Sequence, residues 1–310
     1  MSNPYIYTRQ NSSVKIENID RTDGLSRYWV KLSSNFQAKY LGDNQIIGEY
    51  WYPEVGKQSP LAILVHGMGD RSVIPCHLIA HTLAKKGVAS FILYLVFHQK
   101  RVSPTIRDRY PNLTAEEWFE SYQISVIDIH QVIDWAETRS ELIQGKISIL
   151  GISFGSFVSA IAMALDPRIK AGILVESGGN SDKITRRSLV LRQQYKHTEA
   201  EYRRSQESYA QYLAEIGEKG FENVIACKSS YLTDPMTFSK YLRNRPLLML
   251  NAIWDEIIPK SATLDLWAAN GKPSIRWYPA THASIWMWYP FLSPVIADFL
   301  RSTNGAGIRR

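Results

Sequence analysis

Residues 146–165 read KISILGISFGSFVSAIAMAL, and this stretch decides how the rest of the chain is interpreted. From residue 147 onward it carries no charge, and it is about as long as a membrane-spanning helix, which needs about 20 apolar residues. Gly151, Ser153 and Gly155 interrupt the apolar run, however, and Asp166-Pro167 follows it. The pattern therefore predicts a short buried strand, a tight turn and a helix rather than a membrane span.

The same alternation of short apolar runs and helical patterns continues on both sides of this stretch. Buried strands are predicted at 61–66, 90–95, 146–150, 171–175, 246–251 and 274–278, and helices near 76–86, 115–139, 153–165 and 290–301. The apolar runs are too continuous for strands with one face in water, which is typical of a mostly parallel sheet covered by helices on both faces. Two earlier runs, 27–32 and 45–52, predict antiparallel strands. The predicted fold class is therefore α/β.

The length of 310 residues fits one large α/β core with an insertion. We expect an N-terminal extension with a first strand at 1–44, a core at 45–301 interrupted by a helical lid at 180–232, and a flexible basic tail at 302–310. The insertion places an apolar side chain at every seventh residue, namely Tyr195, Tyr202, Tyr209 and Ile216. This spacing predicts one face of a helix that packs onto the core.

The chain carries 36 Lys and Arg against 29 Asp and Glu, for a net charge of +7. Two irregular segments contribute +3 each. In 183–220 there are eight basic and five acidic residues, and the loop 97–111 has four basic residues and one acidic residue, namely Lys100, Arg101, Arg107, Arg109 and Asp108. The net charge alone does not show whether the partner is a nucleic acid, a membrane surface or an anionic small molecule. No nucleic-acid-binding motif accompanies it, so we expect no nucleic-acid partner.

Cysteine usage and the N-terminus give an expectation about the compartment. Cys76 and Cys227 are far apart and show no metal or redox spacing, so two buried free thiols in a reducing compartment are expected. The first residues lack the basic start and apolar run of a secretory signal. We therefore expect a cytoplasmic protein, and the sequence leaves a homodimer open.

Ser153 is the first candidate for chemistry. It lies in Gly-x-Ser-x-Gly, directly after a predicted strand and directly before a predicted helix. In that context the motif predicts a nucleophile elbow, a strained turn that only small neighbours permit and that projects the serine hydroxyl above the sheet. The helix N-terminus and nearby backbone N–H groups favour developing negative charge at this point.

A serine hydroxyl needs a base, and the base needs an orienting carboxylate. Asp255 and His282 follow the serine in the chain, each just past a predicted buried strand. The carboxyl ends of neighbouring parallel strands meet at one edge of a sheet, so the three side chains can come together there. The order Ser, Asp, His is the one that accompanies a nucleophile elbow.

Alternatives for the acid and the base stay open at this point. Glu176 follows the strand after the elbow and could replace Asp255, while Glu256 is adjacent to Asp255. The other histidines also compete for the role of base, although only His197 follows the serine and it belongs to the insertion. They are His66, His77, His81, His98, His130 and His197.

The tetrahedral intermediate of acyl transfer needs two backbone N–H donors. One is expected from Phe154, immediately after the serine, and the other from Met68 in the loop after the first parallel strand. Gly67 and Gly69 flank Met68 and allow the backbone to approach a substrate closely. His66 is expected to stabilise this loop by hydrogen bonding.

Together these features resemble the α/β-hydrolase superfamily. The resemblance runs from about Gln45 to Arg301, and it is carried by His66-Gly67, Gly-x-Ser153-x-Gly, His282, and Asp255 followed by Ile258-Pro259. It implies an eight-stranded sheet, a Ser-Asp-His triad and no cofactor or metal. Within the superfamily, the chain is similar to microbial carboxylesterases and dienelactone-hydrolase-like esterases. It departs from them at Ser156, where many have glycine, and in the loop after residue 95, which lacks an Asp-x-Arg-Gly pattern.

The expected function is therefore a serine hydrolase that cleaves a small carboxylic ester through an acyl-enzyme on Ser153. A lipase, a thioesterase or an acyltransferase could use the same three residues. Trp286, Trp288, Tyr202 and Tyr209 are candidates for lining the acyl pocket. Because the two basic segments lie where this fold places the mouth of the site, we also expect an anionic ester or interface there.

Overall fold

The computed structural model describes residues 3–9, 13–22, 24–41, 44–54, 56–98, 100–101, 106 and 112–303, and in this range the side chains of residues 70 and 71 are not described. Arg107, Asp108 and Arg109 of the predicted basic loop, and residues 304–310 of the predicted tail, lie outside it.

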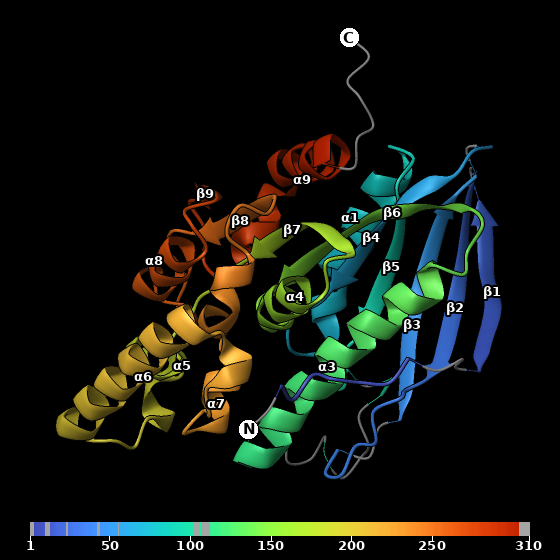
Figure 1. Ribbon diagram of the computed structural model, residues 1–310. Coiled ribbons are helices and arrows are strands. Elements are labelled where there is room, and N and C mark those ends of the chain that lie inside the picture. The colour runs from blue at the N-terminus through green and yellow to red at the C-terminus, as the bar shows by residue number, and fades with distance from the viewer. Residues whose placement is uncertain are drawn as a thin grey trace.

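The fold is a single mixed, mostly parallel sheet with helices on both faces, which confirms the predicted α/β-hydrolase fold (Figure 1). Its strands lie in the order β1-β2-β3-β5-β4-β6-β7-β8-β9. The first three pairings are antiparallel and the remaining ones are parallel. The strands are β1 (Val14–Thr22), β2 (Leu25–Ser33), β3 (Gln45–Pro53), β4 (Ser59–Val65), β5 (Ala89–Tyr94), β6 (Leu142–Ile152), β7 (Ile169–Val175), β8 (Leu247–Ala252) and β9 (Ser274–Tyr278).

The resemblance implied eight strands, and this count is wrong for this chain. The sheet has nine strands, because Val14–Thr22 pairs with β2 along the antiparallel edge. No residue of β1 is buried, so its sequence carries no apolar run. The segment expected as an N-terminal extension with one strand therefore contains both β1 and β2.

The central strands are apolar on both faces because each face meets its own layer of helices. Along β4, Leu61, Ile63 and Val65 belong to one hydrophobic core, and Ala62 and Leu64 belong to the other. Helices α3 (Ala115–Ala136) and α4 (Phe154–Leu165) cover the first face, and α1 (Ile74–Ala84) and α9 (Tyr289–Thr303) cover the second (Figure 1). This rigid centre holds the ends of β6, β7 and β8 in place.

The register of the parallel strands brings their carboxyl ends to one edge. Ile152, the last residue of β6, pairs with Val175, the last of β7, and Val175 pairs with Leu250 of β8. The last residues of β8 and β9 also pair with each other. Side chains just past these four strands are therefore close neighbours.

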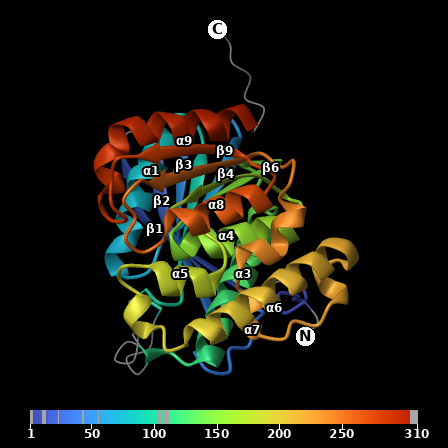
Figure 2. The ribbon, with the colours of Figure 1, turned by 90° about the vertical axis from the view of Figure 1, so that its left-hand side faces the viewer.

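Between β7 and β8 the chain forms a run of helices. Figure 2 shows α5, α6 and α7 beside one another below α8 (Lys260–Ala269). The helical segments of this run are α5 (Ser181–Arg187), η3 (Arg192–Gln194), α6 (Glu199–Lys219), η4 (Phe221–Asn223), α7 (Ser229–Leu232) and η5 (Pro235–Tyr241). Two further short helices are η1 (Asp70–Val73) and η6 (Ser284–Trp288).

The seven-residue pattern of the insertion lies mostly on α6. Tyr209 and Ile216 are buried and belong to the same core as α3 and α4. Tyr195 lies outside this helix, because Thr198 and Glu201 form a capping box that starts α6 after it. The predicted packing face thus begins at Tyr202.

The expectation of two buried thiols is half right. Cys76 is buried in α1, whereas Cys227 is exposed between α6 and α7, and both are free. Among the described residues, every helix is too short or too polar to cross a membrane. The uncharged stretch 147–165 is divided between β6 and α4.

Glu49 of β3 offers a test of the packing between the sheet and α1. Burial would raise the pKa of its carboxyl, but hydrogen bonds from His77, Tyr94 and Trp51 outweigh burial and lower the pKa to about 2. Because the pKa is lower in the folded chain than in the unfolded chain, the carboxylate stabilises the fold above about pH 5, and this is lost as the pH falls toward 2. The contribution at neutral pH is about 3 kcal/mol.

We therefore expect Glu49→Gln to lower the free energy of unfolding at pH 7 by about 2–3 kcal/mol. The difference from the wild type should shrink as the pH is lowered from 5 toward 2, measured by urea denaturation at each pH. A difference that stays constant over this range would contradict the assigned role of the carboxylate.

Candidate active site

Ser153 lies in the turn between β6 and α4. Its φ is 51° and its ψ is −120°, a backbone conformation that a residue with a side chain rarely adopts. Two backbone hydrogen bonds hold the turn, since Ser153 donates to the Val175 carbonyl at 2.8 Å and accepts from the Ser156 N–H at 2.7 Å. The hydroxyl is thereby presented at the carboxyl edge of the sheet.

The two glycines of the motif are required by close backbone contacts. A Cβ atom on Gly155 would lie 2.3 Å from the Val65 carbonyl oxygen of β4. A Cβ atom on Gly151 would lie 2.3 Å from the Gly155 carbonyl oxygen. The helix can therefore start this close to the sheet only because both positions lack a side chain.

The structure brings Ser153, His282 and Asp255 together in the order that the sequence predicted. The Nε2 atom of His282 lies 2.9 Å from the Ser153 Oγ, and its Nδ1 atom lies 2.9 Å from Oδ2 of Asp255. A carboxylate can only accept a hydrogen bond, so Nδ1 carries the proton and Nε2 is free to accept the serine proton. This tautomer is the one a general base needs.

Asp255 is fixed by the turn that follows β8. Its Oδ1 atom accepts hydrogen bonds from the backbone N–H groups of Ile257 and Ile258, at 2.9 and 2.7 Å. The neighbouring Glu256 accepts from the backbone N–H of His282 at 2.9 Å. Of these two adjacent acids, Asp255 thus faces the imidazole ring, and Glu256 anchors the backbone of the loop that carries the ring.

Glu176, the other candidate acid, lies directly after β7 and also faces the ring. Its Oε2 atom is 3.8 Å from Nδ1 of His282, beyond hydrogen-bonding distance. Burial, together with the negative charges of Asp255 and Glu256, holds the pKa of Glu176 well above its usual range. Asp255 is therefore the hydrogen-bonded partner, and Glu176 is a second carboxyl beside it.

The three side chains could in principle form a metal site, since ligand atoms of Glu176, Asp255 and His282 lie within 4.8 Å of one another. The contacts favour a different interpretation. The ring of His282 already joins Asp255 to Ser153, and Asp255 is oriented by backbone donors. This arrangement fits proton transfer from a serine.

The loop after β4 lies against the serine. A Cβ atom on Gly67 would be 3.3 Å from the Ser153 Cβ, so the backbone next to Met68 passes close to the nucleophile. His66 holds this loop as predicted, with Nδ1 2.6 Å from the Gly67 carbonyl and Nε2 accepting from the Leu95 N–H at 3.0 Å. The roles of Met68 and Phe154 as oxyanion donors stay predictions.

An aromatic cluster under the elbow was not predicted. The ring of Phe154 packs against Phe97, Trp118 and Tyr122, with centroid distances of 5.6, 5.4 and 5.0 Å. Trp118 and Tyr122 are four residues apart on α3, so their common helix face was the available signal. The cluster fixes the first turn of α4.

The proposed pocket residues occupy different surroundings. Trp286 and Trp288 lie in η6, which follows His282, and both are half-buried against the core of α1 and α9. Tyr202 packs under the Arg186 guanidinium, 4.4 Å from the ring centroid. Tyr209 is buried against Tyr231, with centroids 4.8 Å apart. A substrate-binding role for these four stays a prediction.

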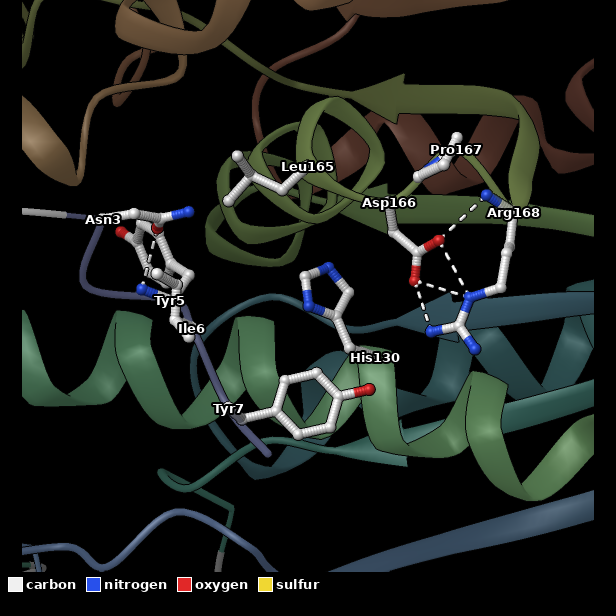
Figure 3. Close-up of a pocket in the computed structure, with 9 residues that line it drawn as sticks. All are labelled: Asn3, Tyr5, Ile6, Tyr7, His130, Leu165, Asp166, Pro167 and Arg168. Carbon is white, nitrogen blue, oxygen red and sulfur yellow. Dashed lines mark hydrogen bonds and ion pairs between the residues drawn. The ribbon is translucent and has the colours of Figure 1, made fainter. Parts of the chain in front are cut away.

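A cavity of about 370 Å³ lies at the opposite end of the sheet, where α4 leads into β7. Figure 3 shows the Arg168 guanidinium against the Asp166 carboxylate, with His130 and Tyr7 beside them. Arg168 also pairs with Asp134 at 2.7 Å, so its charge is matched by neighbouring carboxylates. His130, one of the histidines considered as base, therefore lies far from Ser153 along the strands.

Comparisons with known proteins found a matching family model and structures with the same fold. The family model described as Alpha/beta hydrolase domain containing 18 matches residues 49–286. No curated protein sequence matched the chain.

Several solved structures share the fold. An acetyl xylan esterase from Paenibacillus sp. R4 is 17% identical, with a TM-score of 0.66 over 96% of this chain and 90% of that one. A cold-adapted esterase from an Arctic intertidal metagenomic library, bound to PEG, is 16% identical, with a TM-score of 0.62 over 94% and 99%. Est1E from Butyrivibrio proteoclasticus, bound to ferulic acid, is 18% identical, with a TM-score of 0.59 over 86% and 99%. At these identities the likeness shows the fold alone.

Proposed function

The chain belongs to the family Alpha/beta hydrolase domain containing 18, and from this premise we propose that it is a serine esterase whose nucleophile is Ser153. The observation that carries the proposal is the continuous chain of contacts from Ser153 Oγ through His282 to Asp255, with both distances at 2.9 Å. Two of the similar structures are esterases, and this supports the proposed reaction class.

The proposed reaction has two stages. His282 Nε2 takes the hydroxyl proton while Ser153 Oγ bonds to the ester carbonyl carbon, and the backbone N–H groups of Phe154 and Met68 stabilise the oxyanion. The imidazolium then returns the proton to the leaving alkoxide, which leaves an acyl group on Ser153. In the second stage, His282 takes a proton from water as the water oxygen bonds to the acyl carbon. It then returns this proton to Ser153 Oγ as the bond from Oγ to the acyl carbon breaks and the carboxylic acid leaves.

Asp255 supports both stages electrostatically. The imidazolium that forms transiently carries a positive charge, and the carboxylate 2.9 Å from Nδ1 stabilises it without taking the proton. The two backbone donors on Asp255 Oδ1 keep this carboxylate oriented toward the ring.

We further propose that the helical segment 180–232 acts as a cap over the site. Its link to the site is direct, because the N–H of Leu189 and the hydroxyl of Ser188 donate to the Glu256 carbonyl, at 2.9 and 3.0 Å. The cap also supplies exposed cations at Arg187 and Arg192, whereas Arg186 is paired with Glu199. These two cations are candidates for steering an anionic ester.

A lipase that acts at an interface is the second candidate. Two large apolar side chains beside the loop of Asp255 are exposed: Trp254, which precedes Asp255, at 62%, and Leu189, whose N–H donates to the Glu256 carbonyl, at 65%. Such a surface around a catalytic centre suits contact with aggregated substrate. Activity that rises sharply above the micelle threshold of the substrate would favour this candidate over an esterase for dispersed substrates.

A panel of p-nitrophenyl esters from acetate to long acyl chains, with one anionic hemiester, tests the proposal. We expect hydrolysis of at least one member with an initial burst of p-nitrophenol that matches the protein concentration, because the acyl-enzyme forms before it is hydrolysed. The chain length with the highest kcat/KM defines the acyl class. Absence of both turnover and burst across the panel would contradict the proposal.

A further inference from the structure

Glu176 is the feature of the site that the proposed mechanism leaves unused. The residue follows β7, and its backbone N–H donates to the Leu250 carbonyl of β8 at 2.8 Å. Its φ of 53° is in the left-handed region, which a residue with a long side chain seldom occupies. The fold therefore holds Glu176 in an unfavourable backbone conformation and places its side chain at the carboxyl edge of the sheet.

The side chain points at the same ring nitrogen as Asp255. Glu176 is 2% exposed, and its Oε2 lies 3.8 Å from Nδ1 of His282, while the side chain of His282 is 13% exposed. Its other oxygen, Oε1, is buried and has no hydrogen-bond partner among the described residues. Buried polar atoms normally have hydrogen-bond partners. The carboxyl group of Glu176 therefore has acceptor capacity left for the Nδ1–H donor of His282.

We propose that Glu176 is a reserve acid for His282, a positioning residue whose carboxylate accepts the Nδ1 hydrogen bond when Asp255 cannot. The proposal rests on the serine esterase function proposed above. The proton balance is the same as in the intact site: Ser153 Oγ bonds to the acyl carbon, its proton passes to Nε2 and then to the leaving alkoxide, and the Nδ1 proton stays on the ring throughout. Only the carboxylate that faces Nδ1 changes.

The charge state of Glu176 explains why it is a reserve in the intact protein. Asp255 and Glu256, in the loop after β8, face it with negative charge, and His282, in the loop after β9, is the base beside it. Burial and the two carboxylates keep its pKa raised, which favours the neutral acid. Two carboxylates this close do not both ionise readily.

Removing Asp255 changes this balance in a predictable direction. Asp255→Ala deletes one of the negative charges that raise the pKa of Glu176, whereas burial and Glu256 still raise it. The competent form is the carboxylate, so the remaining activity of the variant must increase with pH as Glu176 loses its proton. The activity of Asp255→Ala is thus displaced to higher pH than that of the wild type.

The experiment compares kcat/KM against pH for the full-length wild type, Asp255→Ala, Glu176→Gln and Asp255→Ala/Glu176→Gln. In the Asp255→Ala background, we expect Glu176→Gln to remove a further tenfold or more, about the size of coupling seen for contacting residues. It should also abolish the alkaline rise. In the background that retains Asp255, the same change should cost less. Ser153→Ala supplies the baseline and tests the proposed function separately.

Two additional variants keep the result interpretable. Asp166→Asn removes a buried carboxylate at the opposite end of β7, beside Arg168 (Figure 3), and in the Asp255→Ala background it should leave the pH profile in place. Asp255→Ala/Glu176→Asp keeps the charge on a shorter side chain and covers the case in which the Gln double variant does not fold. We expect this variant to retain the alkaline rise at a lower rate.

Identical kcat/KM values and pH profiles for Asp255→Ala and either of its Glu176 double variants would overturn the proposal. If Ser153→Ala is inactive in the same assay, that outcome rejects the reserve acid alone and leaves the esterase function standing. If Ser153→Ala remains active, the proposed function fails first.

Discussion

Ser153→Ala is expected to lower kcat on any ester that the wild type hydrolyses by about 10⁴–10⁶, because the serine, the histidine and the aspartate act as one unit. The substitution removes one oxygen atom and adds no new atom at residue 153, whose φ is positive. The stability of the fold and the binding of substrate should therefore change far less than kcat. The kinetics of purified wild type and variant, with melting curves for both, measure the effect.

The variant His282→Ala tests whether the serine and the histidine act as one unit. We expect a loss of similar size, and the double variant Ser153→Ala/His282→Ala should be no worse than either single variant. Losses that multiply in the double variant would show that Ser153 and His282 act independently, contrary to the 2.9 Å contact between them.

Gly155→Ala is expected to have the largest effect on stability. The added Cβ would lie 2.3 Å from the Val65 carbonyl oxygen and 2.4 Å from that of His66, and neither backbone atom can move without disturbing β4. Overpacking of this kind, with rigid backbone on the other side, should cost about 3 kcal/mol or more of unfolding free energy. Denaturant unfolding, or loss of folded protein on expression, measures it.

Gly217→Ala is the matched control, since the same methyl group is added within α6. Nothing lies within 4 Å of a Cβ at this position, and alanine favours a helix more than glycine does. We expect this variant to gain about 0.5–1 kcal/mol. Equal effects of the two substitutions would contradict the close approach of α4 to β4.

The central part of the fold could be predicted because its sequence signals are strong. Strands such as β4, β7 and β8 are apolar on both faces, so their runs stand out from any helical pattern. The turn at Ser153 also has a strong signal, since Gly-x-Ser-x-Gly stands directly between a predicted strand and a predicted helix. The order of strands then placed Asp255 and His282 at the same edge.

The edges of the fold were harder to predict for a physical reason. β1 has no buried residue, and its apolar alternation is limited to Val14 and Ile16, too short to identify a strand. The buried residues of α8 are two small side chains, Ala262 and Thr263, and one large one, Leu266, while Trp267 packs against the core only partly buried. Neither element shows its packing face clearly in its sequence, and β1 is held at the edge of the sheet by its pairing with β2.

Within the site, the sequence identified the candidate acids but not the role of each one. Glu176, Asp255 and Glu256 were all plausible acids. In the structure, Asp255 lies 2.9 Å from Nδ1 of His282 and Glu176 lies 3.8 Å from it, whereas Glu256 accepts a hydrogen bond from the backbone of His282. Side-chain direction at the end of a strand depends on the turn that follows, here on the positive φ of Glu176. Residue order alone does not encode that direction.

The central claim is that Ser153 carries the acyl group, and the most direct measurement is the mass of the protein quenched during turnover of p-nitrophenyl acetate. We predict one acetyl group per chain, located on Ser153 by peptide mapping and absent from Ser153→Ala. An acetyl group at another residue, or one that persists in Ser153→Ala at the same rate, would contradict the account.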